Sequence, residues 1–320
     1  MQSNTLYLGI EIGGTKLQLV AADTHGKVVQ TIRDTIDPAG GAASIRKQIS
    51  HGWQHLNNTE AIAAIGVGFG GPVDWQSGTI RVSHQVAGWA DFNLAEWLQQ
   101  ETGKPVIIEN DANTAALAEA MHGSGKGYSK VFYMTIGSGI GGGMIINENI
   151  YHGRTPGEVE IGHLRLNKQG DTLEQNCSGW AVNNKVKALI EQEPDGMLAQ
   201  LSKGNTTPEA TLLQPALEKG DDAAKTLIAA VADDIALALS HVVHLFHPDV
   251  MIIGGGLSLL KYHLLQPIEQ ILPGYVMHAF LPPPLILLAS LGEQVVPVGA
   301  LELAKHIHHI HNHQNTPNSL

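Results

Sequence analysis

Two strands joined by a glycine-rich turn occur twice in this chain, and this repeat limits the folds that it can adopt. The first copy spans residues 6–22, with Gly13 and Gly14 in the turn. The second begins with an apolar stretch at 130–136 that enters a run of glycines at 137–143. Strands separated by so few residues are typical of β-hairpins. A repeated unit of this kind predicts an internal duplication, with two related α/β domains.

The glycines of both turns are suited to binding phosphate, because backbone N–H groups without nearby side chains can approach an anion closely. Thr15 and Lys16 could add a hydroxyl and a positive charge at the first turn. A plain hairpin turn is the alternative for each motif by itself. The second run also fits G-x-G-x-x-G, the dinucleotide fingerprint, but that fingerprint requires a helix directly after the loop. Residues 144–151 instead read as a strand, a turn and another strand, which disfavours a dehydrogenase.

A polar corner follows the apolar run 106–108, where a predicted strand meets a predicted helix over 115–120. Asn110 and Asp111 lie at this corner. A carboxylate at the start of a helix is stabilised in its ionised form by backbone N–H groups and the helix dipole. It could therefore accept a proton from a substrate hydroxyl. An ordinary helix cap is the alternative, and for an isolated motif it is the commoner one.

Two further glycine-rich loops follow apolar strands. Gly71 and Pro72 come after the predicted strand 61–69, and could form a wall beside a small ligand or a simple turn. The glycines 254–256 come after the predicted strand 249–253, where bare backbone would suit the adenosine part of a nucleotide. Glu160 and His163 lie three residues apart, too few ligands to indicate a metal site.

The composition excludes several classes of protein. The net charge of −11 argues against nucleic acid or an anionic membrane as partner. Cys177 is the single cysteine, so neither an intramolecular disulfide nor a multi-cysteine zinc site can form. The sequence shows no signal-peptide pattern and no apolar run recognised as transmembrane. We therefore expect a cytoplasmic protein.

Taken in order, these motifs resemble the ROK family (repressor, open reading frame, kinase) over roughly the first 300 residues. The stretches that carry the resemblance are 9–16, 70–73, 109–113, 137–143, the Glu-x-Gly-His signature at 160–163, and 252–256. The resemblance implies an α/β protein with the actin/hexokinase-like (ribonuclease H-like) fold, in which duplicated domains flank a cleft. It implies a sugar kinase that uses ATP and Mg²⁺.

The resemblance also implies roles for individual residues. Asp111 is implied as the catalytic base and Glu11 as the residue near Mg²⁺. The segment 173–179 fits the part of the family that carries a further sugar ligand, assigned here to Glu174. The implied substrate-binding residues are Gly71, Pro72, Gln85, Asn110, Asp111, Glu160, His163 and Glu174. The implied nucleotide-binding residues are Gly13, Gly14, Thr15, Lys16, Gly137, Ser138, Gly139, Gly254, Gly255, Gly256 and Leu257.

Three departures from the family pattern modify these expectations. Many members hold a structural zinc through the signature histidine and three cysteines; those cysteines are absent here, so we expect no structural zinc and leave His163 as a sugar ligand. Glu11 replaces the usual aspartate. His84 and Gln85 stand where Pro-Asn is common, which leaves the sugar open. Only eight residues precede the first motif, so we expect no winged-helix DNA-binding domain of the repressor type.

The expected function is transfer of phosphate from ATP to the 6-OH of glucose. N-acetylmannosamine, N-acetylglucosamine, fructose and allose are alternative substrates, polyphosphate is an alternative donor, and a non-catalytic sugar sensor is an alternative function. The family also allows a homodimer. The expected domains are 1–114, completed by a helix near 297–305, and 115–296, followed by a histidine-rich, disordered tail over 306–320 that could bind metal adventitiously.

Overall fold

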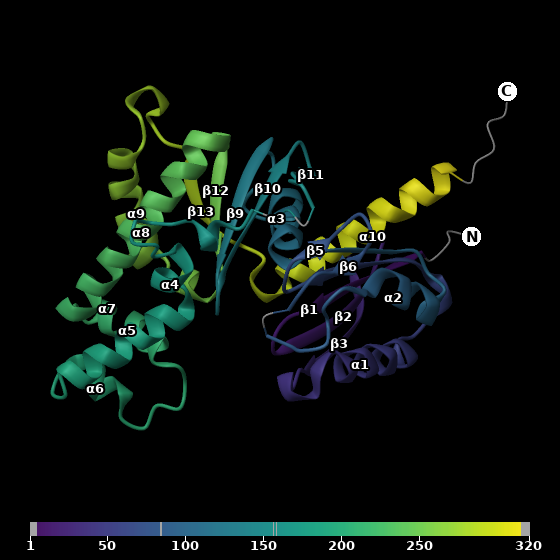
Figure 1. Ribbon diagram of the computed structural model, residues 1–320, viewed down its shortest axis with the longest axis horizontal. Helices are drawn as coiled ribbons and strands as arrows, with labels where there is room; N and C mark the ends of the chain where they lie inside the picture. The colour runs from purple at the N-terminus through teal and green to yellow at the C-terminus, as the bar shows by residue number, and fades with distance from the viewer. Residues whose placement is uncertain (1–4, 84, 156, 158, 315–320) are drawn as a thin grey trace. The chain divides into compact units, whose positions relative to one another are not determined.

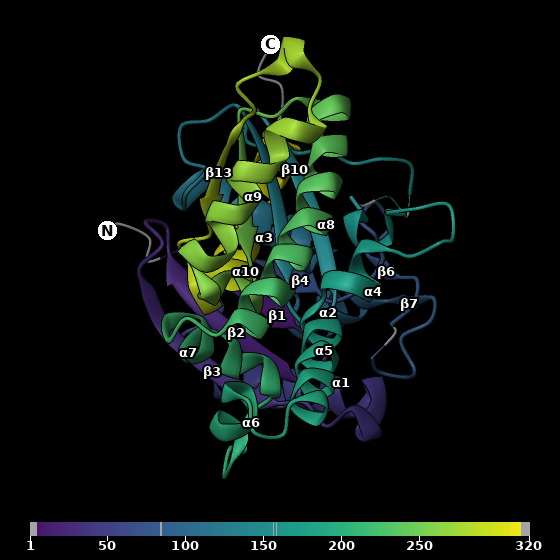
Figure 2. The same cartoon turned by 90° about the vertical axis from the view of Figure 1, so that its left-hand side faces the viewer.

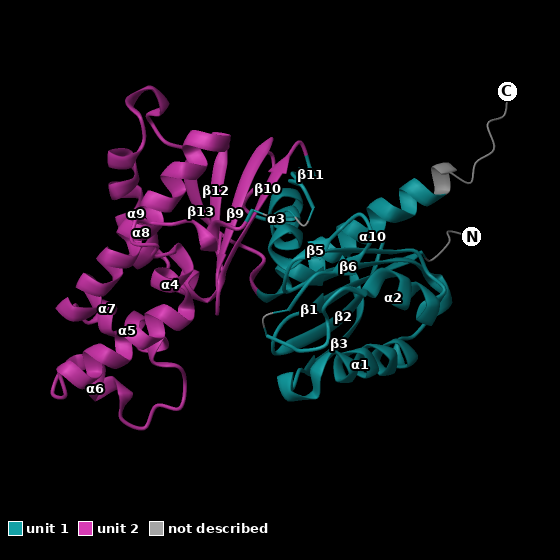
Figure 3. Ribbon diagram, viewed as in Figure 1, with its two compact units in different colours: residues 1–123, 148–159, 293–320 teal, residues 124–147, 160–292 magenta. Residues whose placement is uncertain are grey.

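The chain divides into two compact units, each with its own mixed sheet. The computed structural model describes residues 5–83, 85–155, 157 and 159–314. Unit 1 comprises residues 1–123, 148–159 and 293–320, and unit 2 comprises 124–147 and 160–292 (Figure 3). The first boundary lies at 123 rather than the expected 114, because α3 (Asp111–His122) packs against the last helix of unit 1.

Unit 1 is built on a five-stranded sheet in the order β3-β2-β1-β4-β8. Figure 1 labels β1, β2 and β3 of this sheet. The strand β1 runs antiparallel to β2, as the glycine-turn hairpin predicted, and parallel to β4, which in turn runs parallel to β8. The bounds of these strands are β1 Leu6–Ile12, β2 Lys16–Asp23, β3 Val28–Thr35, β4 Ile62–Phe69 and β8 Val106–Asn110.

The two faces of this sheet bury different helices, because side chains alternate along each strand. Leu8 and Ile10 of β1 belong to a large apolar core that also contains residues of α1 (Gly41–His55) and α2 (Leu94–Thr102). Tyr7 points to the opposite face, into a smaller cluster with residues of α10 (Val295–Gln314).

The helix α10 lies very close to β1 and β4, and glycines make this approach possible. A Cβ on Gly9 would lie 2.7 Å from the Pro297 carbonyl oxygen, and one on Gly66 would lie 1.9 Å from that of Ala300. Larger residues at these positions would push the helix off the sheet.

The histidine-rich segment is helical to Gln314, whereas we expected disorder from residue 306. Ile307 packs against the cluster around Tyr7, and the Tyr7 hydroxyl lies 3.0 Å from Nδ1 of His308. These contacts extend the helix beyond the point where apolar periodicity in the sequence fades.

Two small elements complete unit 1. A three-stranded sheet lies between β4 and α2 in sequence, in the order β5-β6-β7, with β5 at Val73–Asp74, β6 at Thr79–Ile80 and β7 at Phe92–Asn93. The segment 148–159 contains the short strand β11 (Asn149–Ile150).

The sheet of unit 2 repeats the arrangement of unit 1. Its four strands within unit 2 follow the order β10-β9-β12-β13, with β9 antiparallel to β10 and parallel to β12, and β12 parallel to β13. This matches the order and directions of β2-β1-β4-β8, as an internal duplication predicts. The bounds are β9 Lys130–Ile136, β10 Ile140–Ile146, β12 Val250–Gly254 and β13 Leu285–Leu288.

Helices beside this sheet supply the rest of unit 2 (Figure 2). Their bounds are α4 Leu173–Cys177, α5 Gly179–Gln192, α6 Met197–Ser202, α7 Leu213–Glu218, α8 Asp222–Phe246 and α9 Tyr262–Tyr275. The helix α8 is long and apolar enough to cross a membrane, a span that we did not recognise in the sequence; its most apolar window has a mean hydropathy of 1.7. However, 56% of that window is buried within the structure, the pattern of a core helix.

Candidate functional site

The predicted polar corner forms where β8 ends and α3 begins. Asn110 is the N-cap of α3: its side-chain oxygen accepts hydrogen bonds from the backbone N–H groups of Ala112, at 2.8 Å, and Asn113, at 3.2 Å. Asp111 is the first residue of the helix, where the dipole favours a negative charge. The sequence therefore located this corner correctly.

The end of the neighbouring strand β4 lies against this corner. A Cβ on Gly70 would lie 3.4 Å from Oδ2 of Asp111 and 3.6 Å from Cα of Gly13. Asp111 is thereby placed close to the first glycine turn, which we define as residues 13–15. The parallel register explains this, since Ile12, Phe69 and Asn110 end three neighbouring strands at the same edge.

The side chain of Asn110 also reaches the loop after β4, because its Nδ2 donates to the Gly71 carbonyl oxygen at 3.2 Å. The Pro72 carbonyl oxygen accepts a hydrogen bond from the backbone N–H of Arg81 at 3.0 Å, which anchors this loop to the residue after β6. Asn110 thus joins the end of β8 and the start of α3 to the loop after β4. Contact of Asn110, Gly71 or Pro72 with a sugar stays a prediction.

An ion pair lies at the first glycine turn. Nζ of Lys16 is 3.0 Å from Oε1 of Glu11, and Nε2 of Gln18 donates to Oε2 of Glu11 at 2.6 Å. Burial raises the pKa of the Glu11 carboxyl, and the Lys16 charge partly offsets this effect. The Gly13 N–H donates to the Lys16 carbonyl oxygen at 2.9 Å, so it closes the hairpin rather than pointing to a ligand.

Gln85 extends over the same turn. Its side-chain oxygen occupies the space that a Cβ on Gly14 would fill. The structure therefore brings Gln85 to the first glycine turn, 71 residues away from Gly14 in sequence, and its contact with a sugar stays a prediction. His84, the other half of the departure from the family pattern, lies outside the described residues.

The second glycine turn, which we define as residues 137–139, is shorter than the expected loop, because β10 begins at Ile140. The Gly137 N–H donates to the Gly139 carbonyl oxygen at 2.9 Å, so the first glycine closes this hairpin too, but with an acceptor two residues on rather than three. The Gly179 N–H donates to the Gly137 carbonyl oxygen at 2.7 Å, so the start of α5 lies against the turn.

Glu174, expected as a sugar ligand, lies at the second glycine turn. Its Oε2 accepts a hydrogen bond from the Ile140 N–H at 2.7 Å. The signature 160–163 lies at the same strand end, since a Cβ on Gly162 would be 2.3 Å from the Ile140 carbonyl oxygen. Glu160 and His163 are exposed. Unit 2 thus gathers three predicted sugar ligands around the start of β10.

The third glycine loop lies at the same edge of the sheet of unit 2, because β12 runs parallel to β9 with Gly254 opposite Thr135. Gly255 has a φ of +80° and lies against the backbone of Ile136, where a Cβ would be 2.5 Å from its carbonyl atoms. Only glycine fits there without strain. Gly256 begins a short 3₁₀ helix in which Leu257 is buried.

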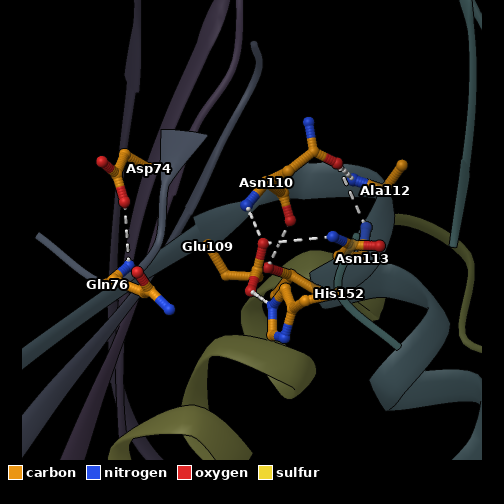
Figure 4. A network of polar contacts seen from close by, with 8 residues as sticks. Asp74, Gln76, Glu109, Asn110, Ala112, Asn113 and His152 are labelled. Atoms are coloured by element: carbon orange, nitrogen blue, oxygen red, sulfur yellow. Dashed lines mark hydrogen bonds and ion pairs between the residues drawn. The ribbon is translucent and has the colours of Figure 1, made fainter. Parts of the chain in front are cut away.

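Sequence reasoning missed one group beside Asp111, shown in Figure 4. Glu109, buried at the end of β8, lies 2.5 Å from Nε2 of His152. The His152 ring stacks on Trp75, with 4.1 Å between ring centroids. Neither His152 nor Trp75 belongs to a recognised spacing, so the pattern alone gave no signal for them.

No group of three or more metal-ligating side chains occurs among the residues that the structure describes. Cys177 is buried in α4, and burial raises the pKa of its thiol to about 12, with the nearby Asp234 carboxylate adding to the rise. A thiol in this environment stays protonated at neutral pH and is a poor metal ligand.

Comparisons with known proteins agree with this arrangement. The chain is similar to the glucokinase of Thermotoga maritima, with 28% identity over 93% of this chain and 96% of that protein. It is also similar to the xylose repressor of Caldicellulosiruptor bescii, with 27% identity over 67% of this chain and 55% of the repressor.

Among solved structures, a ROK family glucokinase from Streptomyces griseus in complex with glucose and AMPPNP matches with a TM-score of 0.81 and 29% identity, over 94% of this chain and 99% of that chain. This likeness confirms the α/β actin/hexokinase-like fold. The ROK family model matches residues 7–307, nearly the whole described chain. The chain belongs to the ROK family.

Proposed function

We propose that this protein is an ATP-dependent sugar kinase and that its substrate is the 6-OH of glucose. The observation that carries the proposal is the position of Asp111, whose carboxylate lies beside Gly70 and the first glycine turn. A fixed carboxylate next to a phosphate-binding turn is the arrangement that phosphoryl transfer to a hydroxyl requires. The glucokinases among the relatives support the choice of glucose.

In the proposed reaction, Asp111 accepts the proton of the sugar hydroxyl as its oxygen attacks the γ-phosphorus of ATP. The bond between the γ-phosphorus and the β,γ-bridging oxygen breaks, and ADP leaves. Each glycine turn would offer its remaining backbone N–H groups to phosphate oxygens, with Lys16 adding positive charge at the first turn. Gly254 and its neighbours would lie against the adenosine.

Glu11 does not fit the role of a direct Mg²⁺ ligand. Both of its carboxylate oxygens already hold a partner, Lys16 on one and Gln18 on the other. A cation bound there would have to displace the Lys16 ammonium. We therefore assign Glu11 the role of orienting Lys16, and no step of the proposed reaction passes through a metal at Glu11.

The test is ADP release from Mg·ATP over a panel of glucose, fructose, allose, N-acetylglucosamine and N-acetylmannosamine, with wild type beside Asp111→Ala and Asp111→Asn. We expect sugar-dependent release that falls by about 10²- to 10⁴-fold in both variants, because each removes the general base. Near-normal turnover in either variant would refute the assignment of Asp111. The same panel with polyphosphate tests the donor.

A sugar sensor is the second candidate, favoured by the similarity to xylose repressors. A sensor would bind a sugar in calorimetry yet release no ADP with any sugar or donor. We also propose that the protein is cytoplasmic and binds sugar and nucleotide rather than nucleic acid; the family allows a homodimer.

A further inference from the structure

The residue directly before the corner is a buried carboxylate. Glu109 is 2% exposed, at the end of β8. A buried carboxylate is costly unless hydrogen bonds and charge satisfy it. The hydrogen bonds of Glu109 therefore indicate which parts of the structure its carboxylate stabilises.

The two oxygens of Glu109 serve different parts of unit 1. Oε1 accepts hydrogen bonds from the Asn110 N–H at 2.8 Å and from Nδ2 of Asn113 at 3.1 Å. Oε2 lies 2.5 Å from Nε2 of His152. One oxygen thus holds the first turn of α3, and the other holds the segment 148–159 (Figure 4).

His152 is itself held in one orientation. Its ring lies nearly parallel to Trp75, with 18° between the planes, and its side chain is 18% exposed. Trp75 follows β5, in a turn where Oδ1 of Asp74 accepts from the Gln76 N–H at 3.2 Å. The stack fixes the plane of the imidazole, and Nε2 is the donor in the bond to Glu109 because a carboxylate oxygen accepts.

We propose that His152 is a positioning residue for Asp111. By donating to Glu109 it fixes the carboxylate that holds Asn110, the N-cap of α3, and Asn113, in the first turn of α3. Asp111 is the first residue of that turn, so the position of its carboxylate depends on how Glu109 holds the turn. The inference rests on the proposed role of Asp111 as the base.

The test compares His152→Asn with His152→Gln. An asparagine amide reaches only as far as Nδ1, so it loses the bond to Glu109, whereas a glutamine amide reaches the position of Nε2 and can still donate. His25→Asn is the matched control, because His25 is exposed in the turn after β2. Trp75→Leu removes the stack and leaves the donor in place.

Two readouts are needed. Turnover by His152→Asn should fall about 10- to 100-fold while KM for sugar and nucleotide stays near wild type, since displacement of a reacting group by about 1 Å has such an effect. Amide hydrogen exchange over 110–113 should rise about tenfold, because the hydrogen bonds that protect these amides weaken. His152→Gln should recover both readouts, and Trp75→Leu should change both in the same direction by less.

Unchanged exchange over 110–113 in His152→Asn would overturn the proposal, as would an equal loss in the asparagine and glutamine variants. If His152→Asn fails to fold, Trp75→Leu and His152→Gln decide by the same criteria. The exchange measurement requires no activity. A wild type that phosphorylates no sugar would therefore refute the proposed function, and raised exchange would still show that His152 holds the turn.

Discussion

The first and second glycine turns share a backbone device but differ in what surrounds them. In both, the first glycine closes the hairpin through its own N–H. Side chains surround the first turn: the Lys16–Glu11 pair lies beside it and Gln85 lies over it. At the second turn, backbone packs on Gly137, whose carbonyl oxygen accepts from the Gly179 N–H, and the side chain of Glu174 lies against Gly139.

The difference teaches how duplicated elements can diverge. A turn covered by side chains can rearrange through rotamer changes and responds to charge. A turn packed against backbone is fixed by the fold and tolerates little change. We therefore expect substitutions at the second turn to destabilise the protein more than matched substitutions at the first.

The largest effect is expected for Gly179→Ala, compared with Gly14→Ala. A Cβ on Gly179 would lie 2.7 Å from the Gly137 carbonyl oxygen, which cannot move without displacing the turn. The free energy of unfolding should fall by about 1–3 kcal/mol, the usual cost of overpacking. Gly14→Ala meets only the end of the exposed Gln85 side chain, so we expect a change within about 0.5 kcal/mol. Urea unfolding followed by circular dichroism measures both variants. An equal loss of unfolding free energy in the two would contradict the expected difference between the turns.

A smaller effect is expected for Glu174→Ala. This change removes the carboxylate oxygen that accepts from the Ile140 N–H and should cost about 1–2 kcal/mol in the free energy of unfolding. Glu174→Gln keeps an acceptor and should recover most of that loss. If both variants bind nucleotide and unfold as wild type does, the carboxylate does not support the second turn.

The smallest effect is expected for Glu11→Gln, and it depends on pH. Because the pKa of Glu11 is raised in the folded state above its ordinary value of 4.5, its contribution to stability is complete below that value. The contribution is lost as pH rises through the folded pKa. The stability of wild type relative to Glu11→Gln should therefore fall as pH increases above 4.5.

At neutral pH the two proteins should differ by less than about 1 kcal/mol, since Lys16 is partly exposed and such ion pairs are weak. Unfolding measured across this pH range checks the sign. A difference that rises with pH would contradict the burial of Glu11 as the main cause of its shifted pKa.

Patterns within short stretches of the sequence predicted the strands and helix starts that depend on neighbouring residues. The strand 130–136 has the predicted bounds, the corner at Asn110 forms as expected, and the family resemblance gave the fold. The site residues remain predictions as sugar and nucleotide ligands, although the structure groups them at the strand ends of each unit.

Long-range contacts escaped prediction for a physical reason. The bond between Glu109 and His152 joins residues 43 apart, and the Tyr7–His308 contact that extends α10 joins residues 301 apart. Neither partner stands in a periodic position relative to the other. Such pairs depend on the path of the whole chain, which spacing within a motif does not encode.

The packing of α10 on glycines of β1 and β4 also affects the order in which the protein can fold during synthesis. The strands β1 and β4 leave the ribosome early, but the helix that covers their bare glycines is translated after all of unit 2. Until then the part of the sheet face that α10 covers, around Gly9 and Gly66, is uncovered. Unit 2 can therefore complete its core before the last helix of unit 1 has been translated. Chaperones that bind exposed apolar sheet would then bind the amino-terminal half of the nascent chain.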